Sequence, residues 1–200
     1  MNVGVLVSGR GSNLQALLDH LQGGDCEVVA VGSNKAEAPA LRRAREADVP
    51  VRVFEQADYA DRASHDLAMA EWLQSKGAEV IVLAGYMALL DPVFIGRFPD
   101  RIVNVHPSLL PAFPGVRAIE QAVAYGVKVF GVTVHLVDEG VDTGAILAQR
   151  AVGLGTMSDP AEVHQHLQRI EHELLPEVVL RLARGEIRRD PDNPRRLLVG

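Results

Sequence analysis

Short apolar segments alternate with amphipathic helical segments along this chain, and this alternation restricts the fold more than any other feature. The apolar segment NVGVLV (2–7) is followed by leucines at 14, 17, 18 and 21, the spacing of one helix face. The segment AEVIVLAGY (78–86) is almost continuously apolar, as in parallel strands that helices cover on both faces. We therefore predict an α/β fold with a mostly parallel sheet flanked by helices.

The later elements follow the same pattern until the chain nears its end. The segments 129–137 and 144–152 leave no room for a helix between them, so we expect an antiparallel strand pair. Pro176 should kink the last helix, and the charged, proline-containing residues from 186 onward should be irregular. With no repeat or linker, residues 1–200 should form one domain. Further strands are expected at 26–34, 51–54 and 101–106, and helices at 38–49, 60–76, 117–126 and 158–185.

Composition excludes several classes of function. The net charge of −6 disfavours nonspecific nucleic-acid binding, which needs a basic face. A single cysteine, Cys26, forms no disulfide within the chain and fits a reducing compartment. The first residues show no basic leader, and their apolar run is too short to span a membrane. We expect a cytoplasmic protein that binds no membrane or nucleic acid and acts as a monomer or homodimer.

A glycine-rich loop, SGRGSN (8–13), lies between the first strand and the first helix. Backbone N–H groups at a helix N-terminus bind anions, and glycines allow a phosphate to approach closely. Leu14 stands where a dinucleotide fingerprint needs glycine, and no Lys-Ser/Thr pair of a Walker loop is present. The loop therefore indicates either a site for a single phosphate at Gly11, Ser12 and Asn13 or a tight turn with a Ser or Asn cap.

The strand near 101–106 ends with two polar residues, Asn104 and His106, before a segment that contains three prolines. Two residues apart on a strand, they point to the same face. Ligands of doubly wound sheets lie at the carboxyl ends of the strands, so both are candidates for a site. The rigid proline segment can form its wall, with Pro111 as the candidate for a cis bond. A turn histidine and a capping asparagine are the simpler alternatives.

A second polar segment, HLVDEGVDTG (135–144), supplies a candidate partner for His106. A carboxylate near that ring would favour its imidazolium form. Amide, imidazolium and carboxylate together suit a tetrahedral oxyanion and a proton transfer. A metal site with His106, His135 and Asp142 as ligands is a weaker alternative, because their spacing matches no preformed metal site. The other histidines lie on helical segments and should be exposed or partly packed: His20, His65, His164, His166 and His172.

Four segments together resemble the glycinamide ribonucleotide transformylase family of folate-dependent formyltransferases: VSGRGSNLQALL, VLAGYMALL, NVHPSLLPAFPG and GVTVHLVDEGVDTGAILAQ. The resemblance covers nearly the whole chain and implies a Rossmann-like formyltransferase fold. It also implies transfer of the formyl group of 10-formyltetrahydrofolate, as co-substrate and without a metal, to the amine of glycinamide ribonucleotide in purine biosynthesis.

The resemblance also assigns roles to individual residues. Ala88 stands where many family members carry Arg, and Arg10 replaces a small polar residue, so the contacts to the folate tail and the phosphate can differ here. The implied catalytic residues are Asn104, His106 and Asp142. The implied nucleotide-binding residues are Gly11, Ser12, Asn13, Gln168 and Glu171. The implied folate-binding residues are Arg62, Met87, Ala88, Leu89, Leu90, Asn104, Asp138, Glu139, Gly140, Val141 and Asp142.

Two other functions remain open from the sequence. A 10-formyltetrahydrofolate deformylase would use the same polar residues with water in place of the amine, although such enzymes usually carry an extra domain before the first strand. A nucleotide-binding module without catalysis would need the glycine loop but not the polar residues of another strand.

Overall fold

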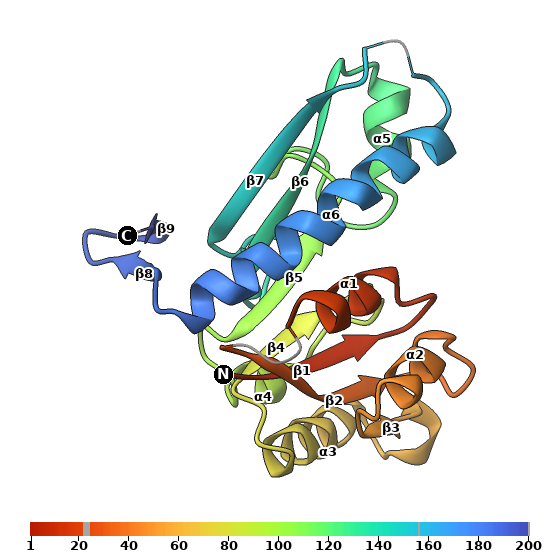
Figure 1. Ribbon diagram of the computed structural model, residues 1–200, viewed down its shortest axis with the longest axis vertical. Helices are drawn as coiled ribbons and strands as arrows, with labels where there is room; N and C mark the ends of the chain where they lie inside the picture. Colours follow the sequence, from red (N-terminus) through yellow and green to blue (C-terminus); the bar gives the residue numbers. More distant parts are fainter. Residues whose placement is uncertain (22–24, 156, 200) are drawn as a thin grey trace. The chain divides into compact units, whose positions relative to one another are not determined.

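The structure, a computed structural model, describes residues 1–21, 25–155 and 157–199. The chain divides into two compact units, Met1–Asn104 and Val105–Gly200. Strands and helices alternate along the first unit, whereas the second contains two pairs of strands that follow each other directly, as Figure 1 shows.

Seven strands form one sheet in the order β3-β2-β1-β4-β5-β6-β7. β1 pairs in parallel with β2 and β4, β2 pairs with β3, and β4 pairs with β5, which confirms the mostly parallel sheet. The chain runs outward from β1 to β3 and then continues on the other side of β1 with β4. Ligands of such sheets bind beyond the carboxyl ends of the strands where the order reverses. These five strands are Asn2–Val7, Glu27–Ser33, Val51–Val53, Val80–Leu83 and Ile102–His106.

Three helices of the first unit form where the sequence predicts them, whereas the short helix Pro92–Ile95 was not predicted. The four leucines of α1 (Ser12–Leu21) are all buried. β4 ends at Leu83, earlier than predicted, and Gly85 follows with a φ of 76°, outside the range of a strand. The other helices of this unit are α2 (Ala40–Glu46), α3 (Arg62–Ser75), α4 (Pro92–Ile95) and a 3₁₀ turn, Gln56–Asp58.

The second unit contains the predicted antiparallel pair, β6 (Val129–Leu136) and β7 (Ile146–Gly153). The long helix α6 (Pro160–Ala183) packs along both strands, and α5 (Ala118–Tyr125) contacts α6 (Figure 1). The Asp159 side chain caps α6 by accepting a hydrogen bond from the Ala161 N–H at 2.9 Å. α6 continues through Pro176 as a single helix.

The prediction of an irregular tail is wrong. Residues from 186 onward form an antiparallel hairpin of β8 (Ile187–Asp190) and β9 (Asn193–Val199). Its turn is stabilised by Asp190, whose side chain accepts from the Asp192 N–H at 2.9 Å. The Asp-Pro-Asp-Asn sequence is therefore a hairpin turn, and the charged residues around it belong to two short strands.

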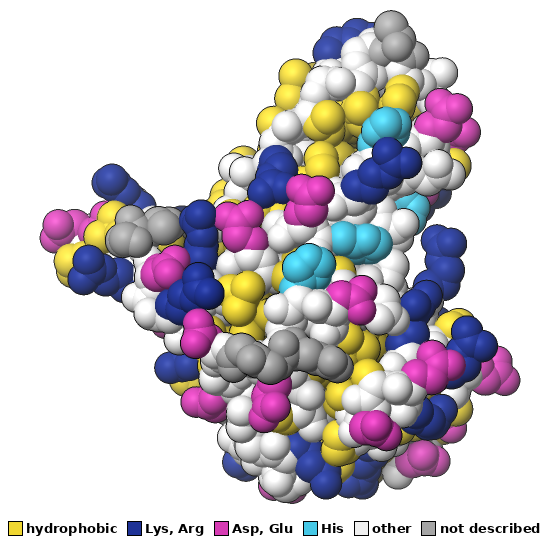
Figure 2. Space-filling view, in the orientation of Figure 1, with side chains coloured by type: hydrophobic (Ala, Val, Ile, Leu, Met, Phe, Trp, Pro, Cys, Tyr) yellow, Lys and Arg dark blue, Asp and Glu magenta, His cyan; other side chains and the backbone are white. Residues whose placement is uncertain are grey.

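Positive and negative side chains are interspersed over the face shown in Figure 2. Among the described residues, no helix combines the length and the apolar character that crossing a membrane requires.

Candidate active site

The second unit brings one carboxylate between two histidine rings. Asp142 Oδ2 lies 3.3 Å from His106 Nδ1, and Asp142 Oδ1 lies 3.5 Å from His135 Nε2. His106 ends β5, His135 lies near the end of β6, and Asp142 belongs to the loop between β6 and β7. Both rings are buried, and the Asp142 side chain is 12% exposed. The three form a compact acid–base group that the chain places largely away from water.

A backbone carbonyl orients each ring toward the carboxylate. His106 Nε2 lies 2.9 Å from the Phe113 carbonyl oxygen, and His135 Nδ1 lies 2.8 Å from that of Leu136. A carbonyl oxygen only accepts, so the ring nitrogen that faces it carries a proton. The second nitrogen of each ring faces Asp142, and a doubly protonated ring would donate to both neighbours.

Asp142 is held in its ionised form. The pKa of its carboxyl falls from 3.8 to about 2, chiefly because of the hydrogen bond with His135. Burial opposes this shift, while the Gly115 N–H, which donates to Oδ2 at 2.7 Å, and the charge of His106 add to it. The backbone of Asp142 has a φ of 53°, the left-handed region that aspartate tolerates better than most residues.

This pKa shift predicts a loss of stability in acid. A carboxyl with a lower pKa in the folded state stabilises the protein above its unfolded pKa, and the gain disappears as pH falls through the folded pKa. Between pH 6 and pH 2, ionised Asp142 should account for about 2 kcal/mol of the unfolding free energy lost. Urea unfolding at both pH values should show a correspondingly smaller loss for Asp142→Asn. The same pH dependence in variant and wild type would contradict the assignment.

The proline-rich segment after β5 is fixed to the β6–β7 pair by side-chain hydrogen bonds. The buried Thr133 hydroxyl donates to the Ser108 carbonyl at 2.7 Å and accepts from the Leu110 N–H at 3.1 Å. Gln149 Nε2 donates to the Leu110 carbonyl at 2.9 Å. The Leu110–Pro111 bond is cis, which confirms the sequence prediction. These bonds set the path that brings the Phe113 carbonyl to His106.

The loop that carries Asp142 has no space for a larger residue at its end. A Cβ on Gly144 would collide with the Leu136 carbonyl oxygen. Asp138 Oδ1 accepts from the Gly140 N–H at 3.1 Å and the Thr143 hydroxyl at 2.6 Å, which fixes the turn. The predicted folate-binding residues of this loop, Asp138, Glu139, Gly140 and Val141, are all exposed.

Gly144→Ala should therefore displace this loop from β6. We expect a loss of about 2–4 kcal/mol in unfolding free energy, because the collision is with backbone. Thermal unfolding measures this loss. Gly155→Ala is the control, since a Cβ there meets no atom within 4 Å. Equal melting temperatures for the two variants would contradict the prediction.

The other predicted site residues of this part of the sequence are Asn104 on β5 and Gln168 and Glu171 on α6. Asn104 precedes His106 by two residues on β5, so strand alternation directs both side chains to one face. Glu171 is buried on α6, and Gln168 is half-buried one turn before it.

The predicted phosphate loop lies in the first unit, between β1 and α1. Gly11 has a φ of 73°, and a Cβ there would lie 2.5 Å from the Ala40 side chain, so only glycine fits. The loop is also bound from α2, since the Arg43 Nε–H donates to the Arg10 carbonyl at 3.0 Å. Ser12 and Asn13 begin α1, and the N-terminus of a helix favours an anion.

The predicted folate loop follows β4 in the same unit. Met87 is 75% exposed and Leu89 is 58% exposed, while Ala88 and Leu90 are half-buried. Exposed apolar side chains at the end of a central strand fit the binding of a flat aromatic ligand. Arg62 is exposed at the start of α3.

Sequence reasoning missed a buried pair in the first unit. His65, expected at or near the surface, is 3% exposed, and its Nδ1 lies 2.6 Å from Asp66 Oδ1. Its Nε2 donates to the Phe54 carbonyl at 2.9 Å. Asp66 Oδ2 in turn accepts from the Asp91 N–H at 2.6 Å, at the far end of the loop after β4. The adjacent His-Asp sequence was the one signal that could have indicated this network.

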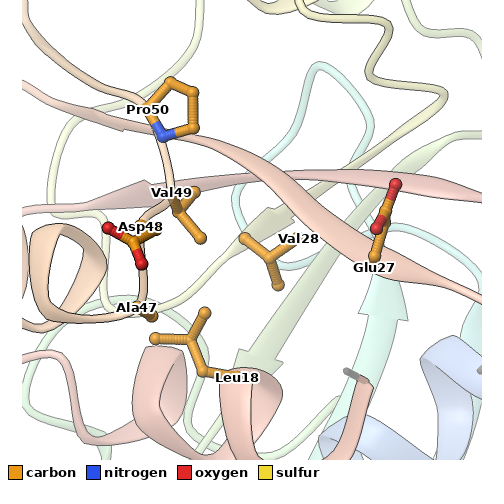
Figure 3. A pocket seen from close by; sticks show the side chains of 7 residues that line it. All are labelled: Leu18, Glu27, Val28, Ala47, Asp48, Val49 and Pro50. Atoms are coloured by element: carbon orange, nitrogen blue, oxygen red, sulfur yellow. The ribbon is translucent and has the colours of Figure 1, made fainter. Parts of the chain in front are cut away.

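Two further observations bear on the ligands. Among the described side chains, no group of three or more His, Cys, Asp or Glu is arranged to bind a metal ion. A surface hollow of about 340 Å³ lies in the first unit, and Figure 3 shows the seven residues around it. None of these is a predicted site residue, so the hollow does not identify the site: Leu18, Glu27, Val28, Ala47, Asp48, Val49 and Pro50.

Comparisons with known proteins, by sequence and by structure, agree with one another. The model of a family described as formyl transferase matches residues 1–179. The phosphoribosylglycinamide formyltransferase of Mycobacterium tuberculosis (strain H37Rv) is 44% identical over 180 residues, which is 90% of this chain and 83% of that protein. A trifunctional purine biosynthetic protein of Drosophila pseudoobscura pseudoobscura is 42% identical over 191 residues, 94% of this chain, although these span only 14% of its own length.

Solved structures also resemble this chain. The crystal structure of glycinamide ribonucleotide transformylase 1 from Symbiobacterium toebii superposes with a TM-score of 0.95 at 41% identity. The match covers 100% of this chain and 93% of that structure.

Proposed function

Because the chain belongs to the formyl transferase family, we propose that it transfers the formyl group of 10-formyltetrahydrofolate to the amine of glycinamide ribonucleotide. The products would be formylglycinamide ribonucleotide and tetrahydrofolate. The observation that carries this proposal is the ionised Asp142 beside the buried ring of His106. The match of the family model to both compact units supports a single formyltransferase domain.

In this proposal, His106 and Asn104 stabilise the oxyanion that forms when the nucleotide amine attacks the formyl carbon. Preorganised N–H donors of this kind contribute about 2.7–4 kcal/mol each to transition-state stabilisation. The His106 Nε2–H currently donates to the Phe113 carbonyl. The substrate oxygen must therefore replace that carbonyl as the acceptor before the ring can take part.

Asp142 would favour the protonated ring of His106 and help to pass the proton of the attacking amine to the folate nitrogen. Its carboxylate, with a pKa of about 2, is ionised at neutral pH and has both oxygens next to imidazole nitrogens. As the carbonyl re-forms, the bond between the formyl carbon and the folate nitrogen breaks, and the proton from the amine ends on that nitrogen. Because the amine attacks the formyl carbon directly, the reaction needs no covalent enzyme intermediate. Positioning of the two substrates would supply much of the remaining acceleration.

The binding roles rest on the chemistry of the loops. The N–H groups at Gly11, Ser12 and Asn13 would bind the nucleotide phosphate, and Gln168 and Glu171 would contact the same nucleotide. Met87 and Leu89 would contact the folate ring system. A cytoplasmic location, supported by the single cysteine, is part of the same proposal.

A coupled assay tests the function directly. The protein is mixed with 10-formyltetrahydrofolate and glycinamide ribonucleotide, and formyl transfer to the nucleotide is measured beside release of free formate. We expect transfer that depends on the nucleotide and little formate. Formate release at the same rate without the nucleotide would instead indicate a deformylase, and nucleotide binding without turnover a binding module.

A further inference from the structure

The loop after β4 is fixed at two points by buried side chains, although two of its apolar side chains, Met87 and Leu89, are exposed. The Met87 N–H donates to Ser8 Oγ at 2.9 Å, and the Asp91 N–H donates to Asp66 Oδ2 at 2.6 Å. Ser8 is 5% exposed and Asp66 is 2% exposed. The backbone between these two points is therefore held by buried side chains, while Met87 and Leu89 remain exposed to solvent.

Ser8 connects more than this one loop. It follows the last residue of β1, and its hydroxyl donates to Asn34 Oδ1, just beyond β2, at 2.7 Å. The Ser8 N–H donates to the Gly85 carbonyl at 3.2 Å. Through its hydroxyl and its backbone, this one residue links the carboxyl ends of β1, β2 and β4, where the strand order of the sheet reverses.

Ser8 is also the first residue of the glycine loop, and the rest of that loop has little freedom. The Ala40 N–H donates to the Gly9 carbonyl at 3.1 Å, and Arg43 Nε–H donates to the Arg10 carbonyl. Gly11 packs directly against Ala40. These contacts hold residues 9–13 in one arrangement that continues into Ser8. An anion bound to the N–H groups of residues 11–13 would therefore stabilise this arrangement.

We infer that Ser8 is a positioning residue that couples the phosphate loop (9–13) to the folate loop (84–91). Its hydroxyl would transmit the position of one loop to the Met87 N–H of the other, so each bound substrate favours the geometry that the second requires. The identity of the two ligands rests on the proposed function, whereas the mechanical link rests on the hydrogen bonds alone.

Hydrogen exchange of the ligand-free protein tests the link without any assay of activity. Ser8→Ala removes the acceptor for the Met87 N–H, and exchange of that amide should become about tenfold faster. Ser33→Ala is the matched control, because Ser33 is also a buried serine at a strand end and bonds to the backbone of Lys35. Exchange at Met87 should be unchanged in the control and restored in Ser8→Thr. Unchanged exchange at Met87 in Ser8→Ala would overturn the inference.

Steady-state kinetics with both substrates separate a positioning role from a general loss of structure. Ser8→Ala should raise the KM for glycinamide ribonucleotide and for 10-formyltetrahydrofolate by roughly fivefold or more each, with a smaller change in kcat. Asp66→Asn, at the other end of the folate loop, should raise the KM for the folate alone. A change confined to one KM in Ser8→Ala would disprove the coupling.

The two hypotheses fail in different ways. If wild-type protein transfers no formyl group while Met87 exchange rises in Ser8→Ala, the proposed function is wrong and the link between the loops stands. If wild-type protein is active and Ser8→Ala leaves both KM values and Met87 exchange unchanged, the function stands and the role of Ser8 is wrong.

Discussion

Replacement of His106 by alanine is expected to lower kcat for formyl transfer by about 10²–10⁴-fold. The variant loses the proposed oxyanion donor and the ring through which Asp142 is proposed to act, since the two residues lie 3.3 Å apart. Binding of glycinamide ribonucleotide should change little, because its phosphate is assigned to the loop at 11–13. Single-turnover rates and calorimetric titration with the nucleotide measure the two effects separately.

The control for this variant is His164→Ala, which removes a half-buried histidine from α6. Its kcat should stay close to that of the wild type. Loss of nucleotide binding in His106→Ala, with turnover retained at saturating nucleotide, would assign His106 to binding instead of chemistry.

The fold was predictable because each element depends on local chemistry. The leucines of α1 are spaced for one helix face, and the apolar run near β4 is long enough for a strand but too short for a buried helix. The hairpin after α6 was missed for a physical reason. The two strands are four and seven residues long and carry their arginines and leucines in adjacent pairs, without the alternation of a half-buried strand. Their pairing depends on a turn whose residues also occur in irregular loops.

The site was predictable only in part. The parity of Asn104 and His106 follows from the strand, and the acidic loop 135–144 is visible as a cluster of polar residues. Which of its carboxylates lies beside His106 depends on a left-handed residue and on the space at Gly144, which no local pattern indicates. The position of His135 beside Asp142 was not predictable either, because it depends on the pairing of β6 with β7.

The linking role of Ser8 was not predictable for a related reason. Its partners Asn34 and Met87 are 26 and 79 residues away in the chain. They meet it because parallel strands end at the same edge of the sheet. A serine before a glycine loop indicates a turn or a cap, so its second role appears only once the strand order is known.

Asp142→Asn should lower kcat by about 10²–10³-fold and also change how the rate depends on pH. The amide has nearly the shape of the carboxylate but carries no charge, so nothing at this position favours the protonated ring of His106. The limb on the alkaline side of the kcat profile, where the rate falls as this ring loses its proton, should therefore move to lower pH. Asp138→Asn is the matched control, since Asp138 lies in the same loop and an amide oxygen can still accept from Gly140 and Thr143. Its profile should keep the wild-type form, and an unchanged profile in Asp142→Asn would remove that carboxylate from the path of the proton.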